Sequence, residues 1–249
     1  MNPTNVIEIG ELRRSCASCS LQQLCLPASI EADELDRLDR AVRARRPLRR
    51  GEHLYHQGDV ARSLFVSRDG AFKTVTVDPE GESQIIGLHL PGELIGLDGM
   101  GSGRHLCAAE ALQTATVCEL PMSQLETLLP QLPGLQRQLL RVMGRSRDQD
   151  QSHVELLGRR QADDRMLLFL HGLRERYLLL GHDADQITLP MSREDMASYL
   201  GVVLETVSRS LGRLQDEGLI DVRGRQLHIL DARRLAQRVQ GEPPRQVGS

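Results

Sequence analysis

Three of the five cysteines lie within ten residues near the amino terminus. They form the pattern Cys16-Ala-Ser-Cys19-Ser-Leu-Gln-Gln-Leu-Cys25, in which a C-x2-C turn can direct two thiolates at one centre and a third follows after a short loop. In a reducing compartment, such a cluster favours metal binding or redox sensing over disulfides, and the odd cysteine count argues the same way. We therefore expect a metal centre in this segment.

The spacing of these cysteines favours some kinds of metal centre over others. A structural zinc site more often has a second paired motif, which the sequence lacks. A c-type haem would need a histidine where Ser20 stands. A 4Fe-4S cluster takes four cysteines, and two further cysteines, Cys107 and Cys118, could supply the fourth. Unrelated buried thiols are the alternative interpretation.

The composition bounds the class of protein. With 249 residues, 40% of them apolar and 26% charged, the chain should form one large or two modest globular domains. No apolar run reaches the length of a membrane span, and the first fifteen residues lack a secretory pattern, so we expect a cytoplasmic protein without a membrane partner. The single lysine, Lys73, follows no glycine-rich loop, and G-x-S-x-G and H-E-x-x-H are absent, which argues against an enzyme.

The sequence pattern around the cysteines changes from helical to strand-like along the chain. Residues 29–46 have a helical pattern, and residues 47–121 read as short strands separated by glycine turns 11 or 12 residues apart. This rhythm predicts a small antiparallel β-barrel or roll. The turn glycines are Gly58, Gly70, Gly81 and Gly92.

Residues 125–158 have the period of a long helix with a narrow apolar stripe, interrupted by the polar run RSRDQDQS. The stripe consists of Leu132, Leu135, Leu139, Val142, Met143, Val154 and Leu157. Such a stripe favours a dimer seam. On a two-fold axis Asp150 would face its own copy and weaken the dimer. The alternative is a lone surface helix with a solvated middle.

The segment MSREDMASYLGVVLETVSRSLGRLQDEGLI predicts a helix-turn-helix. Ser192 and Asp195 form a capping box for a first helix, Gly201 breaks it, and a second helix runs from about Leu204 to Asp216. The hairpin LIDVRGRQLHIL that follows is typical of a wing.

One face of that second helix carries Glu205, Ser208 and Arg209 at i, i+3 and i+4. In a DNA major groove a glutamate can accept a hydrogen bond from cytosine, and an arginine can donate two to guanine. A serine hydroxyl can contact either a base or a phosphate. The alternative is a solvated face on which Glu205 pairs with Arg209. The candidate phosphate contacts are Arg193, Arg213, Arg223 and Arg225.

Together these segments resemble the cyclic-AMP receptor protein superfamily of bacterial regulators, and more closely its oxygen-sensing branch, the fumarate and nitrate reduction regulator (FNR) and related anaerobic regulators. The resemblance rests on CASCSLQQLCLP, GLHLPGELIGLDGM, VCELP and LGVVLETVSRSLGRLQDEGLI, and it extends from Cys16 to about Leu230.

The resemblance implies an α+β fold. We expect a cysteine-rich head over residues 1–28, then a sensor domain over 29–124 that is a double-stranded β-helix, a jelly-roll like cyclic-nucleotide-binding domains. A dimerisation helix over 125–158 and a winged helix-turn-helix domain over 161–235 follow, with a tail over 236–249.

The resemblance also implies roles for residues. The family's V-C-E-[IL]-P segment matches Cys118 as the fourth cluster ligand, and the E-x-x-S-R pattern matches Glu205, Ser208 and Arg209. Asp150 matches the family's seam aspartate. Cys107-Ala108 stand where cyclic-nucleotide-binding relatives carry an Arg-Ser pair, so no cyclic nucleotide is expected.

The function that the resemblance implies is oxygen-responsive transcription regulation. One 4Fe-4S cluster per subunit, on Cys16, Cys19, Cys25 and Cys118, would promote a homodimer that binds a palindromic operator with TTGAT-type half-sites. With RNA polymerase as a partner, it would activate or repress genes of anaerobic metabolism. Alternatives are a regulator of the same fold that senses nitric oxide, haem or another small effector without a cluster, a zinc-stabilised DNA-binding protein, and an iron-sulfur enzyme.

Overall fold

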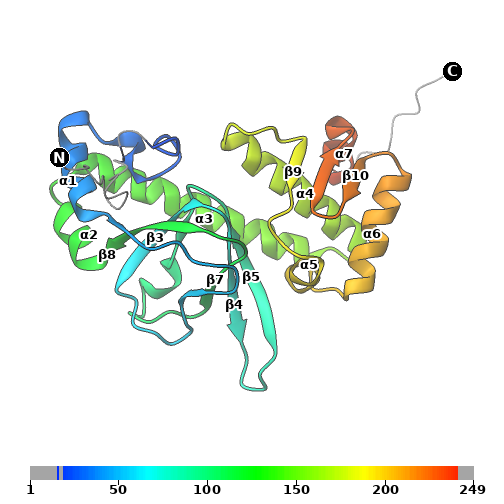
Figure 1. The fold of residues 1–249 in the computed structure, drawn as a ribbon, viewed down its shortest axis with the longest axis horizontal. Coiled ribbons are helices and arrows are strands. Elements are labelled where there is room, and N and C mark those ends of the chain that lie inside the picture. The colour runs from blue at the N-terminus through cyan, green and yellow to red at the C-terminus, as the bar shows by residue number, and fades with distance from the viewer. Residues whose placement is uncertain (1–15, 17–18, 241–249) are drawn as a thin grey trace, which may run out of the picture.

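The fold consists of two lobes joined by one long helix (Figure 1). The computed structural model of the chain describes Cys16 and residues 19–240, so most of the predicted head and the end of the predicted tail lie outside the described residues. A β-rich lobe comes first and an α-rich lobe last, and helix α3 (Pro133–Gly158) runs between them. The predicted α+β class is confirmed.

The first lobe is a roll of two four-stranded antiparallel sheets. The first sheet has the order β1 (Arg43–Ala44), β8 (Thr116–Pro121), β3 (Ser63–Asp69), β6 (Leu94–Ile95). The second has the order β2 (His53–Tyr55), β7 (Ala108–Ala111), β4 (Phe72–Val77), β5 (Ser83–His89). Phe72 and Ile95 are completely buried in the core of the roll. The predicted antiparallel roll is therefore present.

The turn glycines have the conformation that the hairpins need. All four predicted positions have a positive φ. Gly70 is the most constrained, because its φ is +77° and an added Cβ would lie 2.6 Å from the Cβ of Ala115. Only glycine fits both the left-handed backbone and this close approach.

The helix before the roll is shorter than predicted. After the 3-10 turn η3 (Leu26–Ser29), helix α1 spans Ala32–Ala41, and the chain is already extended at Val42. Residues 43 and 44 pair with β8 instead of continuing the helix. Pro47 also disfavours helical backbone at the residue before it.

The predicted helix over 125–158 is divided in two. Helix α2 spans Met122–Leu128, and α3 begins at Pro133. Leu132 has φ −126° and ψ 83°, which agrees with the restriction that a proline places on the residue before it. The interruption allows α2 and α3 to take different directions.

The apolar stripe of α3 is largely covered within the subunit. Leu135, Leu139 and Val142 pack into a core with residues of the roll, so they are not available for a dimer seam. Leu140 and Val154 are 64% and 67% exposed and lie on the outward face of the helix. Sequence periodicity located an apolar stripe, but it did not distinguish the face that covers the roll from the face left open.

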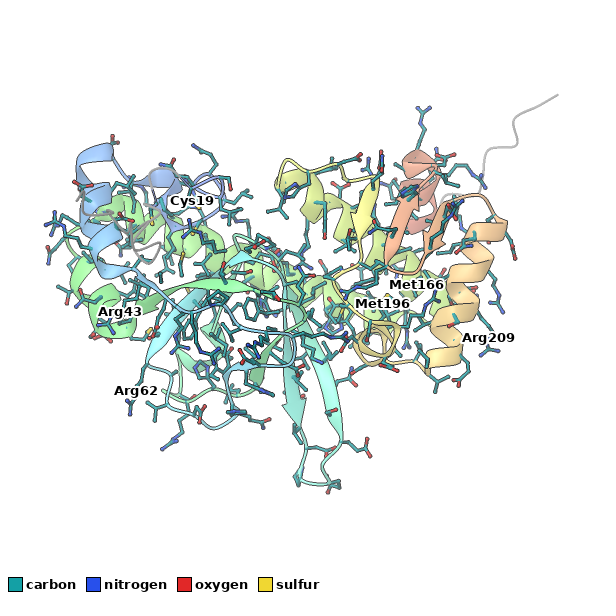
Figure 2. All side chains as sticks on the ribbon, in the orientation of Figure 1. Cys19, Arg43, Arg62, Met166, Met196 and Arg209 are labelled. Atoms are coloured by element: carbon teal, nitrogen blue, oxygen red, sulfur yellow. The ribbon has the colours of Figure 1, made fainter. Side chains whose placement is uncertain are left out.

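The second lobe is a winged helix-turn-helix. Its helices are α4 (Ala162–Leu179), α5 (Arg193–Leu200), α6 (Leu204–Asp216) and α7 (Ala232–Val239). Its sheet has the order β10 (Ile220–Arg223), β11 (Gln226–Ile229), β9 (Gln186–Thr188). Met166 on α4 and Met196 on α5 are buried in its core (Figure 2). None of the helices in the described part of the chain has the length and apolar character to cross a membrane.

The local signals for this lobe are confirmed. The Ser192 hydroxyl accepts a hydrogen bond from the Asp195 amide, and the Asp195 side chain accepts one from the Ser192 amide, which is the predicted capping box. Gly201 ends α5 with a φ of +62°. Helix α6 has the predicted bounds, and β10 and β11 form the predicted wing.

Candidate metal centre and nucleic-acid interface

Four of the five cysteines line one pocket, and they are the four predicted as ligands. Three come from the head and Cys118 comes from β8. The other lining residues are mostly apolar and come from the head, α1, β3 and β8: Leu21, Gln22, Leu26, Pro27, Leu38, Val42, Val66, Arg68 and Leu120. Figure 2 shows Cys19 in the head, beside the roll.

Backbone hydrogen bonds and strand register position these cysteines. The Cys25 amide donates to the Leu21 carbonyl at 3.0 Å, and the Cys16 amide donates to Asp39 Oδ1 of α1 at 2.8 Å. Cys118 is held between two strands, because it pairs with Ala44 of β1 and Val66 of β3. The folded head and the strand pairing thereby bring cysteines that are distant in the sequence to one pocket.

Burial in the pocket favours the protonated form of three of these thiols. Burial raises the pKa of Cys25 to about 12, with a smaller opposing effect of the Leu26 amide. Burial, and then the hydrogen bond with Asp39, raises the pKa of Cys16. Burial also raises the pKa of Cys118, and the positive charge of Arg68 opposes it. Thiolates are the form that binds metals, so these three cysteines need a bound cation to lose their protons near neutral pH.

The donor set of the pocket fits a thiophilic metal group. Four cysteines in an apolar surrounding are the ligands that iron-sulfur clusters and structural zinc use. In the part of the chain that the structure describes, however, no three histidine, cysteine, aspartate or glutamate side chains have an arrangement ready for a metal ion. The side chains would therefore have to reorient around a bound group.

The head is hydrogen-bonded directly to helix α3. The side chain of Gln138, which is 3% exposed, donates to the Cys25 carbonyl at 3.0 Å. The Arg145 guanidinium donates to the Leu24 carbonyl at 2.8 Å. A rearrangement of the cysteine loop must therefore change the environment of α3.

The fifth cysteine, Cys107, lies apart from the pocket. It is buried in the core of the roll, and its Sγ is 3.4 Å from Asp98 Oδ2. The hydroxyl of Tyr55 donates to the same carboxylate at 3.3 Å, and the ring of His105 stacks on Tyr55. Burial, followed by the charge of Asp98, raises the pKa of Cys107 to about 12. Sequence patterns did not indicate this network, because its members come from separate strands and loops.

The three predicted DNA-reading residues share the exposed face of α6. Glu205, Ser208 and Arg209 are all exposed. The Arg209 guanidinium donates to the Thr206 hydroxyl at 3.0 Å, and within the described part of the chain it forms no ion pair with Glu205. Figure 2 shows Arg209 on α6, at the far end of the molecule from Cys19. The alternative of a closed Glu205–Arg209 pair therefore does not describe this helix.

All four candidate phosphate contacts have partners in this structure, and Arg193 donates to the Ser208 hydroxyl at 3.4 Å. Arg225 donates from Nε to the Leu189 carbonyl at 2.9 Å and also reaches the Pro190 carbonyl, so it ties the tip of the wing to the segment that follows β9. Arg213 pairs with Asp163 at 2.7 Å. Arg223 pairs with Asp221 at 3.1 Å, but its side chain at the wing tip is 85% exposed and remains accessible to a phosphate.

Asp150 lies on the exposed surface of α3, beside the pocket between the two lobes. Partial burial raises the pKa of its carboxyl group, while the charges of Arg147 and His153 oppose the shift. A carboxylate in this position repels another negative charge brought against the same face of α3.

A sensor roll, a connecting helix and a winged helix-turn-helix with an open recognition face define a DNA-binding transcription regulator and not an enzyme. Residues 45–131 match the family described as cyclic nucleotide-binding domain, and residues 165–238 match the Crp-like helix-turn-helix domain.

Similar proteins show to which family of transcription regulators the chain belongs. The chain is 45% identical over 217 residues to the transcriptional activator protein anr of Pseudomonas aeruginosa, covering 87% of this chain and 89% of that protein. It is 37% identical over 231 residues to the fumarate and nitrate reduction regulatory protein of Escherichia coli strain K12, covering 93% and 92%. The solved structure of FixK2 from Bradyrhizobium japonicum matches with a TM-score of 0.71 and 30% identity, covering 79% of this chain and 96% of that one. The chain belongs to the CRP/FNR family of transcription regulators, in the branch of the FNR and Anr proteins.

Proposed function

We propose that this protein is an oxygen-responsive regulator of anaerobic metabolism that holds one 4Fe-4S cluster per subunit. The ligands would be Cys16, Cys19, Cys25 and Cys118. The observation that carries the proposal is that these four cysteines, and not Cys107, line a single pocket. The names of two relatives support the same function, since one is a transcriptional activator and the other a fumarate and nitrate reduction regulatory protein.

In this proposal the four cysteines bind the cluster, and other residues connect the cysteine loop to helix α3. The four thiolates would attach a redox-active iron-sulfide core, and that core would be the group that oxygen or nitric oxide attacks. The apolar walls of the pocket limit the access of water to the thiols. Gln138 and Arg145 bind the backbone of the cysteine loop, so the position of that loop determines how α3 is supported.

Helix α3 is the proposed dimer seam. Its outward face carries Leu140 and Val154 as apolar contacts and Asp150 as a repulsive one. Because the repulsion keeps monomer and dimer close in free energy, a coupling of about 1 to 3 kcal/mol from the head would decide between them.

The dimer would read a palindromic operator with TTGAT-type half-sites, one α6 helix in each major groove. Glu205, Ser208 and Arg209 would contact bases, and Arg223 a phosphate. We place the protein in the cytoplasm with RNA polymerase as a partner, activating some genes and repressing others.

The proposal includes no cyclic nucleotide, although the roll matches the cyclic nucleotide-binding family. A cyclic phosphate is held best by a guanidinium fork and a hydroxyl. At the corresponding place in this chain Cys107 and Ala108 are buried, and Cys107 is hydrogen-bonded to Asp98. A carboxylate there repels a phosphate.

The test is the iron and acid-labile sulfide content of protein isolated without air, together with its operator binding before and after exposure to air. We expect about four iron and four sulfide per chain, a colour that air removes, and a parallel loss of operator binding. Zinc in a colourless protein, or operator binding that air does not change, would contradict the proposal.

A further inference from the structure

His153 on α3 connects the two lobes of the molecule. Its side chain is buried, with 7% exposure. Nδ1 lies 3.1 Å from the carbonyl oxygen of Ile86 on β5, and Nε2 lies 2.8 Å from the carbonyl oxygen of Tyr199 on α5. Strand β5 belongs to the sensor roll and α5 is the first helix of the helix-turn-helix, so one imidazole ring contacts both lobes.

The two contacts can both be hydrogen bonds in only one protonation state of this ring. Both partners are backbone carbonyls, which only accept hydrogen bonds, whereas a neutral imidazole has a single N–H to donate. Only the imidazolium form donates to Ile86 and Tyr199 together. The His153 ring also stacks on the Tyr199 ring, with centroids 3.9 Å apart and planes at 6°, which fixes its orientation between the two carbonyls.

We propose that His153 is a proton-dependent positioning residue, which in its charged form holds α5 against β5 and thereby sets the position of the recognition helix α6. Helices α5 and α6 share one core, in which Ala197 and Val207 are buried. A displacement of α5 therefore carries α6 with it. Loss of the proton removes one of the two hydrogen bonds, and with it one of the two links that His153 makes between the lobes.

Other contacts between the lobes do not depend on a histidine. The Ile85 amide donates to the Ser198 hydroxyl at 3.0 Å, and Lys73 of β4 pairs with Asp195 of α5 at 2.9 Å. These contacts persist through neutral pH, so the proton on His153 adjusts the docking of α5 and does not create it.

Titratable and charged groups face His153 from every element packed around it. Burial lowers the pKa of His89 on β5 to about 4, so this ring is uncharged near neutral pH. Arg176 on α4 and Glu93 after β5 neutralise each other at 2.6 Å. The remaining groups lie on α3, α4 and α5: Asp148, Asp150, Glu155, His171, Glu175 and Tyr199.

His171 is the matched control, because it lines the same pocket but makes no bridge between the lobes in the described part of the chain. Its buried Nδ1 has no hydrogen-bond partner among the described residues. A pH effect that arose from the pocket in general would involve His171. An effect of the proposed bridge would involve His153 alone.

The experiment is hydrogen exchange of the α5 amides in the full chain between about pH 5.5 and 8, corrected for intrinsic exchange rates. We expect protection to fall with rising pH by up to about tenfold per unit. His153→Gln should remove this slope, His171→Gln should keep it, and Ser198→Ala should lower protection at every pH while keeping the slope.

A wild-type profile without a slope, or a slope that His153→Gln retains, would overturn the proposal. Imidazole nitrogen NMR of the wild-type protein provides a second measurement that needs no folded variant. At the acid end both His153 nitrogens should carry slowly exchanging protons. A neutral tautomer throughout the range would equally overturn it. Neither result depends on a cluster or on DNA.

Discussion

Lys73, the only lysine of the chain, forms an ion pair with Asp195, and the same carboxylate caps helix α5. The distance from Nζ to Oδ1 is 2.9 Å, and the two side chains are only 16% and 12% exposed. One carboxylate thus stabilises the start of the helix-turn-helix and attaches it to strand β4 of the sensor roll. Glu110 on β7 lies 3.3 Å from the same ammonium and completes the cluster.

Lys73→Met should destabilise the folded chain by about 2 kcal/mol, between the values for exposed and fully buried pairs. Burial alone would raise the pKa of Asp195, but the hydrogen bonds from Lys73 and Ser192 outweigh it and lower that pKa. A lowered carboxyl pKa stabilises the fold above the unfolded value near 3.9, and this stabilisation is lost as pH falls through the folded value. Denaturant unfolding should therefore show the full effect at pH 7 and a smaller one below about pH 4.

The matched control for this variant is Arg223→Ala, which removes an exposed pair with Asp221. It should change stability by less than about 0.5 kcal/mol. Equal destabilisation by both variants would show that the Lys73–Asp195 pair has no special role.

Cys118→Ala should abolish iron binding, whereas Cys107→Ala should retain it. Of these two, only Cys118 lines the pocket of the head cysteines, and Cys107 is hydrogen-bonded to Asp98 in the roll. The measurement is iron and sulfide per chain after isolation without air. Circular dichroism should confirm that each variant is folded, and the reverse assignment of the two variants would refute the proposed ligand set.

Asp150→Ala should yield a dimer in air, with a dissociation constant lower by about 5- to 150-fold. Asp148→Ala is the control, since Asp148 lies on the same helix and is also exposed. Analytical ultracentrifugation measures both. A variant that remains as monomeric as the wild type would rule out repulsion at Asp150.

The dimer should also depend on pH through Asp150. Partial burial raises the pKa of this carboxyl group, so it takes up a proton at a higher pH than an ordinary aspartate does. The neutral form removes the repulsion, and dimerisation in air should therefore increase as pH falls. Asp150→Asn should be dimeric without this dependence, and an unchanged pH profile in the variant would assign the effect to another group.

Arg209→Ala should weaken specific operator binding by about 1 to 3 kcal/mol per half-site without changing stability. The side chain is exposed, and it donates a hydrogen bond to Thr206 on the same helix. Arg50→Ala, an exposed change in the sensor lobe, is the control. Gel-shift titrations with an operator and a scrambled duplex should show the loss on the operator alone; equal loss on both would indicate a phosphate contact.

Features set by neighbouring residues were predictable from sequence. The capping box of Ser192 and Asp195, the bounds of α6 and the wing depend on contacts within a few residues. The turn glycines of the roll belong to the same class, because a left-handed backbone favours glycine wherever it occurs.

Features set by distant neighbours were not predictable in the same way. The stripe of Leu135, Leu139 and Val142 is covered by residues of the roll within the same subunit. Arg225 turns to the backbone carbonyls of the segment after β9 instead of projecting from the wing tip. In both cases the partner comes from a separate element, and periodicity contains no information about it.

The sequence by itself determined the cysteine spacing of the head, the residues that share the exposed face of α6 and the position of each turn, because these are properties of spacing along the chain. Only the tertiary structure decided that Cys118 shares a pocket with the head, that Lys73 holds the cap of α5, and that His153 lies between two carbonyls. Each of these relationships joins residues that strand pairing and helix packing bring together, and their chemistry follows from that proximity.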